Sequence, residues 1–140
     1  MVTTFDDDTL RSRPMHIVQE SFDGVLYFFA PNDGSIVSEA VDYREVGIAF
    51  SDRQSGTYLS LSGNAQLSNN KEKFDELWND DMDLLFPKGK DGGEAALLAV
   101  EIYQGESWSA HKGLSRFHER LRAHTDKKPA HMSTNDKYNA

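Results

Sequence analysis

The sequence predicts a mainly β protein, an antiparallel barrel with peripheral helices. Six or seven short runs rich in β-branched and aromatic residues are spread along the 140 residues. The helical patterns are inserted between these runs and do not alternate regularly with them, which argues against a doubly wound parallel sheet. Gly63 lies in the middle of one run and indicates the bulge or bend that is typical of strands in small barrels.

The first half of the chain is predicted to consist mostly of strands. Polar turns separate the runs and predict two consecutive hairpins at the start. The predicted strands span residues 2–5, 10–18, 25–29 and 46–50. Between the last two, Pro31-Asn32-Asp33-Gly34 is a turn, and Ser35 can cap a short helix that runs to about Glu45.

The second half is predicted to contain one bent strand, two helices and two further strands. Alternating polar and apolar residues predict a half-buried strand from Tyr58 toward Asn69. Apolar residues at helical spacing follow from Asn70, and Phe86-Pro87 closes that helix. The remaining predicted elements are strands at 95–103 and 106–110 and an amphipathic helix from Leu114 to about Thr125.

Length, charge and composition restrict the class of protein. One domain is expected over residues 1–126, followed by a polar tail, 127–140, that is ill-ordered or loosely docked. Fifteen Lys and Arg against 23 Asp and Glu leave a net charge of −8, so we expect no nucleic-acid or membrane partner. No apolar run is long enough to span a bilayer, the start does not resemble a signal peptide, and cysteine is absent. We therefore expect a cytoplasmic protein.

Two arginines near the start of the chain form the first candidate site. Arg11 and Arg13 are two residues apart in a predicted strand, so their side chains point to the same face and repel each other unless an anionic group lies between them. The guanidinium fork matches phosphate oxygens in a bidentate manner, which makes this pair the best candidate phosphate site in an acidic protein. An equally compatible interpretation is that both arginines pair with surface carboxylates such as Asp6 to Asp8.

A strand with three consecutive aromatic residues forms the second candidate site. Alternation sends Phe28 to one face and Tyr27 with Phe29 to the other, so a ring could flank a flat conjugated ligand or a subunit partner. A strand buried on both faces explains the pattern equally well. Immediately downstream, Gly34-Ser35 at a helix start offers backbone N–H groups suited to an anion.

The sequence offers little support for metal or hydrolytic chemistry. The five histidines have no metal-ligand spacing, so no metal site is expected. No serine lies in a nucleophile-elbow context, and we identify no catalytic acid or base. Of the two tryptophans, Trp78 is interpreted as helix core, whereas Trp108 lies on a short polar strand that gives it no such role.

Taken in order, several stretches resemble the general stress protein branch of the pyridoxamine 5′-phosphate oxidase-like family. They are Met1–Thr4, Leu10–Met15, Phe22–Phe29, Tyr58–Ala65, Glu76–Trp78, Phe86–Gly89 and Glu106–Trp108. Each motif alone is short. Their order along nearly the whole chain makes the resemblance specific.

The resemblance implies a split β-barrel of the FMN-binding type that forms a homodimer and holds FMN in clefts between the two subunits. The residues that it implies around FMN and its phosphate are Arg11, Ser12, Arg13 and Met15, with Phe28, Phe29 and Ala30 beside the isoalloxazine and Trp108 closing the site from the second subunit. The argument from the charges of Arg11 and Arg13 indicates the same phosphate site.

The chain departs from the family at three positions near the implied phosphate site. The family commonly has a threonine at the position of Ala30, and a serine and a lysine near Gly34 and Ile36. Each lost hydrogen bond to a charged group is worth on the order of 1 to 3 kcal/mol. FMN binding is therefore expected to be weakened, and Ser35, one place away, would compensate only in part.

Two functions remain open from the sequence. One is an FMN-binding general stress protein that acts as a flavin-dependent oxidoreductase, in which the cofactor performs the redox step. The alternative is a non-enzymatic dimeric binding module with weak or lost flavin binding. The run Arg116–Arg120 is similar to the substrate-binding run of true pyridoxamine phosphate oxidases, and the last amphipathic helix explains it equally well.

Overall fold

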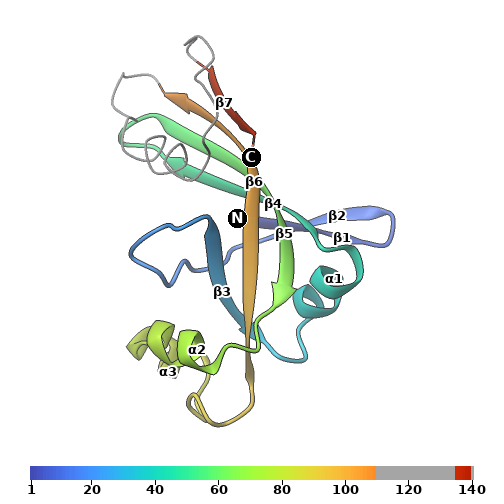
Figure 1. The fold of residues 1–140 in the computed structure, drawn as a ribbon, viewed down its shortest axis with the longest axis vertical. Coiled ribbons are helices and arrows are strands. Elements are labelled where there is room, and N and C mark those ends of the chain that lie inside the picture. The colour runs from blue at the N-terminus through green and yellow to red at the C-terminus, as the bar shows by residue number, and fades with distance from the viewer. Residues whose placement is uncertain (110–134, 140) are drawn as a thin grey trace.

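The protein is an antiparallel sheet curled into a split barrel, with short helices packed outside it (Figure 1). The computed structural model describes residues 1–109 and 135–139. The strands are β1 (Val2–Asp6), β2 (Thr9–Arg13), β3 (Val25–Pro31), β4 (Glu45–Asp52), β5 (Thr57–Leu67), β6 (Ala95–Ser109) and β7 (Asn135–Asn139). The helices of the described residues are α1 (Ser35–Tyr43), α2 (Lys71–Leu77) and α3 (Asp80–Leu85).

The longest strand, β6, organises the sheet. The strand order is β2-β1-β4-β5-β6-β3, and every pairing is antiparallel. One edge of β6 pairs with β5 over most of its length. The other edge pairs with β3 at residues 95–101 and with β7 at residues 104–108. Helix α1 lies beside β1 and β5, and α2 and α3 lie together near the lower end of β3 in Figure 1. The predicted class, mainly β with a split antiparallel barrel, is confirmed.

Local chemistry explains the first hairpin and the end of β2. Asp6 pairs with Thr9, which leaves a two-residue turn in which Asp7 has a φ of 51°, a conformation that Asp tolerates better than most residues. The prediction of a strand from 10 to 18 was too long, and the second predicted hairpin does not form, because β3 pairs with β6 and not with β2. Strand β2 ends at Arg13 because Pro14 follows it and has no N–H to donate to a ladder.

Two other boundaries differ from the sequence predictions. The helix predicted from Asn70 to Phe86 is two short helices, because the side chain of Asn79 accepts hydrogen bonds from the N–H groups of Asp81 and Met82 and so starts a new helix. The two strands predicted at 95–103 and 106–110 are one strand. Gln104 and Gly105 at the expected break stay paired with β5.

The C-terminal predictions are tested only in part. The amphipathic helix predicted from Leu114 to Thr125 lies outside the described residues. Within the tail expected to be ill-ordered or loosely docked, Asn135–Asn139 forms β7 and pairs with β6 in register from Gln104 to Trp108. This part of the tail therefore extends the sheet.

Strand β3 is buried on both faces and separates two apolar clusters. Phe28 lies in the barrel interior together with Leu98 of β6. Phe29, its neighbour in sequence, points to the opposite face and packs under α2 and α3. There Trp78 lies 5.3 Å from the Phe29 ring and 5.4 Å from Phe74, centroid to centroid. Trp78, interpreted as helix core, lies at the C-cap of α2 and is half-buried against this cluster. Strand β3 is buried on both faces, as one of the two interpretations expected.

Gly63 marks the bulge that the sequence indicates. The register between β5 and β6 shifts between Ser62 and Gly63. A Cβ at position 63 would lie 2.7 Å from the carbonyl oxygen of Glu101 and 2.7 Å from Cγ1 of Val100. The two strands therefore approach each other here in a way that only glycine permits.

Gly63→Ala is expected to lower the free energy of unfolding by about 1 to 3 kcal/mol, because the new methyl group must push backbone or core atoms apart. Urea denaturation followed by circular dichroism measures the change. Gly47→Ala in β4 is the matched control, since its Cβ would meet only the Cβ of Thr3 at an ordinary 3.8 Å. Equal stability of the two variants would show that the bulge does not require glycine.

Candidate functional site

The two arginines of β2 lie side by side and meet a buried carboxylate. Arg11 is about half exposed and Arg13 is mostly buried. Between them lies Glu39 of α1, whose side chain is only 6% exposed. Its Oε1 atom is 2.5 Å from Nη2 of Arg13 and 3.2 Å from Nη1 of Arg11. One carboxylate oxygen thus accepts from both guanidinium groups.

Further hydrogen bonds hold this cluster of Arg11, Arg13 and Glu39, which we call the arginine cluster. Thr4 of β1 donates to Oε2 of Glu39 at 2.5 Å and accepts from Nη1 of Arg13 at 2.7 Å. Arg13 also donates to Oγ of Ser35 at 3.0 Å, and Arg11 pairs with Asp6 at 2.8 Å. These bonds join β1, β2 and the first turns of α1.

For the two arginines, the surface-carboxylate interpretation is confirmed in part, whereas the phosphate site stays a prediction. An acidic group does lie between them, as their repulsion requires, but it is Glu39 of the same chain. Asp6 pairs with Arg11, as the surface-carboxylate interpretation expected, whereas neither Asp7 nor Asp8 forms an ion pair with either arginine. Glu39 and Thr4 were missed. The sequence could have indicated Glu39, because it lies one helical turn after Ser35 and therefore on the same face of α1.

The electrostatics of the cluster keep Glu39 ionised. Burial by itself raises the pKa of Glu39, because the charged form loses solvent. Hydrogen bonds from Arg13 and Thr4, together with the positive charges of Arg13 and Arg11, outweigh burial and leave the pKa below its ordinary value. At neutral pH the arginine cluster therefore contains a full negative charge.

The three positions at which the chain departs from the family supply no side-chain donors to this cluster. Ala30 is completely buried, and the side chain of Ile36 points into the barrel, where it lines an internal cavity. At Gly34 a Cβ would lie 2.9 Å from the carbonyl oxygen of Pro31, so a serine would require a local shift. Among the residues that the structure describes, a phosphate at this place would meet the arginines and Ser35 but no lysine.

The other residues implied by the resemblance lie apart from the arginine cluster. Ser12 bonds to Thr3 across the first hairpin at 2.8 Å, and Met15 packs against the barrel core. Phe28 and Phe29 are buried in the two apolar clusters, so neither ring offers an open face within one chain. The structure therefore brings together Arg11, Arg13 and Ser35 and leaves these rings in the core.

Trp108 lies near the end of β6, directly opposite Tyr58 of β5. Its side chain does not belong to the arginine cluster, so the two do not form one site within a single chain. The two rings are unusually exposed for their size, at 38% for Trp108 and 49% for Tyr58. They lie opposite each other near the ends of β5 and β6, and we call them the aromatic pair.

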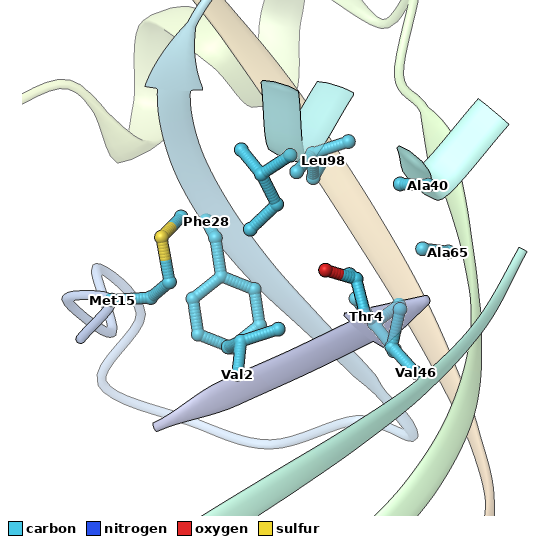
Figure 2. Close-up of a pocket in the computed structure, with 10 residues that line it drawn as sticks. Val2, Thr4, Met15, Phe28, Ala40, Val46, Ala65 and Leu98 are labelled. Carbon is cyan, nitrogen blue, oxygen red and sulfur yellow. The ribbon is translucent and has the colours of Figure 1, made fainter. Parts of the chain in front are cut away.

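The cavities near these residues do not fit a flavin within a single chain. The barrel interior holds a void of about 10 Å³ next to Thr4, Met15 and Phe28 (Figure 2). That volume is at most enough for one water molecule. A larger groove of about 380 Å³ lies between α2 and the segment that precedes β3, but Glu20, Asp23 and Glu76 outnumber Lys73 along it. Among the described residues, the arginine cluster is the better match for an anion.

Two searches for other site types gave negative results for the described part of the chain. No group of three or more His, Asp or Glu side chains in residues 1–109 and 135–139 could hold a metal ion. No helix in these residues is both long and apolar enough to cross a bilayer.

The curled antiparallel sheet, with its arginine pair on the second strand, places the chain in the class of split-barrel proteins. The family model described as "Pyridoxamine 5'-phosphate oxidase like" matches residues 1–130. The chain therefore belongs to the pyridoxamine 5′-phosphate oxidase-like family. No curated protein matches it significantly.

Solved structures of similar fold extend this result. A putative general stress protein 26 from Jannaschia sp. CCS1 is 24% identical, with a TM-score of 0.72 over 99% of this chain and 89% of that one. A general stress FMN/FAD binding protein from Xanthomonas citri is 25% identical, with a TM-score of 0.65 over 81% and 82%. A putative general stress family protein from Xanthomonas campestris is 26% identical, with a TM-score of 0.64 over 74% and 78%.

Proposed function

We propose that the protein is an FMN-binding general stress protein that works as a homodimer and as a flavin-dependent oxidoreductase. The observation that carries the proposal is the convergence of Arg11 and Arg13 on one acidic oxygen, Oε1 of Glu39. A cluster that already binds a carboxylate oxygen has the donors and the shielding that a phosphate oxygen requires. The description of the Xanthomonas citri protein as FMN/FAD binding supports the same ligand.

The residues present fit the phosphate of FMN in part. Arg11, Arg13 and Ser35 supply charged and neutral donors from β2 and the start of α1. Ala30, Gly34 and Ile36 supply none. When bound, FMN would supply the electron transfer through its isoalloxazine. The chain's own residues would anchor the phosphate, and the arginine cluster contains no neutral acid or free base for proton transfer.

A second candidate function is favoured by the same geometry. The alternative is a dimeric binding module that binds flavin weakly or not at all, and it is favoured because the arginines are already neutralised by Glu39 and Asp6. The two candidates are separated by the flavin absorbance of the purified protein and by titration of colourless protein with FMN. Failure to reconstitute with excess FMN would select the binding module.

Arg13→Ala is expected to weaken FMN binding at least tenfold, because Arg13 donates three hydrogen bonds against two from Arg11, and its loss leaves the charge of Glu39 to repel the phosphate. Quenching of flavin fluorescence in a titration measures the Kd. Arg53→Ala in the turn between β4 and β5 is the control, since it removes the same charge from an exposed site outside the cluster. Equal Kd values for Arg13→Ala and the wild type would remove this residue from the proposed site.

We propose the homodimer on the exposed aromatic pair of Trp108 and Tyr58. Rings of this size at a sheet end are typical of interface cores, where their burial contributes strongly to association. Light scattering at micromolar concentration is expected to give twice the mass of 15.8 kDa. Tyr58→Ser combined with Trp108→Ser is expected to shift the protein toward the monomer. A monomeric wild type would contradict the dimer.

A further inference from the structure

We propose that Glu39 is an intramolecular competitor for the phosphate of the ligand and sets how strongly the site distinguishes a phosphorylated flavin from a non-phosphorylated one. The inference rests on the proposed function, because it assumes that the arginine cluster is the anchor of a flavin. It goes beyond that function by assigning an inhibitory role to a residue of the chain itself.

Three of the four Nη groups of the two arginines already donate hydrogen bonds within the chain. Arg13 donates through Nη1 to Thr4 and through Nη2 to Ser35 and Glu39. Arg11 donates through Nη1 to both Asp6 and Glu39. A phosphate oxygen that approaches Nη1 of Arg11 and Nη2 of Arg13 must therefore displace Oε1 of Glu39 or share these donors with it.

The charges in the cluster lead to the same conclusion. The two arginines contribute +2 and Glu39 contributes −1, and Asp6, which pairs with Arg11, brings the sum over the cluster and this neighbour to zero at neutral pH. A phosphate monoester carries a charge of about −1.5 to −2 at pH 7. Such a group gains little net attraction from charges that sum to zero, and the carboxylate of Glu39 repels it at short range.

Glu39 has little freedom to move aside, whereas Asp6 has much more. Thr4 holds the second carboxylate oxygen of Glu39, and the side chain is 6% exposed. Helix α1 is itself anchored on the barrel by the buried side chains of Ile36 and Ala40. The side chain of Asp6 is 42% exposed and can rotate into solvent. Glu39 is therefore the carboxylate that a bound phosphate must face.

A direct comparison of two flavins isolates this effect. FMN and riboflavin share the isoalloxazine and differ in the phosphate, so the ratio of their Kd values reports the contribution of the phosphate alone. In the wild type we expect FMN to bind less than about tenfold more tightly than riboflavin. In Glu39→Gln, which keeps the side-chain length and removes the charge, we expect the ratio to rise at least tenfold through tighter FMN binding.

Two matched variants complete the experiment. Glu39→Asp keeps the charge and is expected to leave the ratio within about threefold of the wild type. Asp6→Asn removes the more exposed carboxylate and is expected to raise the ratio by about two- to threefold. Circular dichroism shows whether Glu39→Gln folds. Inorganic phosphate should compete with FMN more strongly in Glu39→Gln than in the wild type.

The outcomes separate the inference from the proposed function. If both flavins bind and the ratio in folded Glu39→Gln equals that of the wild type, the competitor role is wrong while flavin binding stands. If Glu39→Gln does not fold, a wild type that binds FMN more than about tenfold more tightly than riboflavin overturns the role. If neither flavin binds to any variant, the proposed function and the inference both fail. FMN binding that appears only in Glu39→Gln supports the inference most strongly.

Discussion

Phe28→Ala is expected to lower the free energy of unfolding by about 3 to 5 kcal/mol. The ring is 2% exposed and lies in the barrel interior between β1 and β6. It also lines the small void next to Met15 and Thr4, so its removal would enlarge an existing cavity (Figure 2). An apolar void of this kind is not filled by water and leaves the neighbouring side chains without contacts. Urea denaturation followed by circular dichroism measures the loss.

The same variant tests the role that the family resemblance implies for this ring. If Phe28 lay beside the isoalloxazine, its truncation would lower the flavin affinity of the protein with little change in stability. If it is a core ring, truncation lowers mainly the stability. Phe5→Ala is the control, because Phe5 is 40% exposed and packs only loosely near Tyr43, with ring centroids 6.1 Å apart. We expect that variant to lose about 1 kcal/mol or less. A Phe28→Ala protein as stable as Phe5→Ala would contradict the core assignment.

Glu39→Ala is expected to lower the free energy of unfolding by about 3 kcal/mol, near the lower end of the range for breaking a buried ion pair. The substitution leaves Arg11 and Arg13 facing each other without a counter-ion and removes the acceptor of Thr4. The half exposure of Arg11 keeps the loss from being larger, because solvent screens part of its charge. Chemical denaturation at neutral pH measures this value.

A surface glutamate serves as the control for Glu39→Ala. Glu76 pairs with Lys73 on the exposed side of α2 at 2.9 Å. Exposed pairs of this type contribute about 0.2 to 1 kcal/mol, so Glu76→Ala is expected to stay close to the wild type. Equal stability of the two alanine variants would show that burial of Glu39 does not matter.

The pH dependence of stability provides an independent check on the same residue. Because the pKa of Glu39 is lower in the folded protein than its ordinary value of 4.5, its contribution is fully present above that value. The contribution is lost as the pH falls below 4.5 through the lowered pKa of the folded state. The difference in stability between the wild type and Glu39→Ala should therefore shrink in that acidic range. A constant difference would contradict an ionised Glu39.

Local sequence signals determined much of the barrel. The runs of β-branched residues predicted the first hairpin, and Gly63 marked a bulge because a Cβ there would collide with the backbone of the next strand. Pro14 could have corrected the end of β2, and Asn79 could have placed the break between α2 and α3, since each acts on its immediate neighbours. Such features depend on a few adjacent residues and so are visible without the fold.

The arginine pair shows where sequence reasoning reached its limit. Period-two geometry correctly placed Arg11 and Arg13 on one face and required an anion between them. The identity of that anion depended on how α1 docks against β1 and β2, which brings Glu39 next to residues 26 and 28 positions earlier in the chain. No local pattern specifies that distance, and so the sequence left phosphate and carboxylate as alternatives.

The sequence by itself determined the first hairpin, most strands of the first half, the bulge and the side of β2 that carries positive charge. The tertiary structure decided that Phe28 and Phe29 both lie in cores, because α2 and α3 cover the outer face of β3. It also decided that the positive charge of β2 is balanced within the chain. Both outcomes depend on contacts between elements that are far apart in the sequence. These elements pack together and exclude solvent only when the barrel has formed.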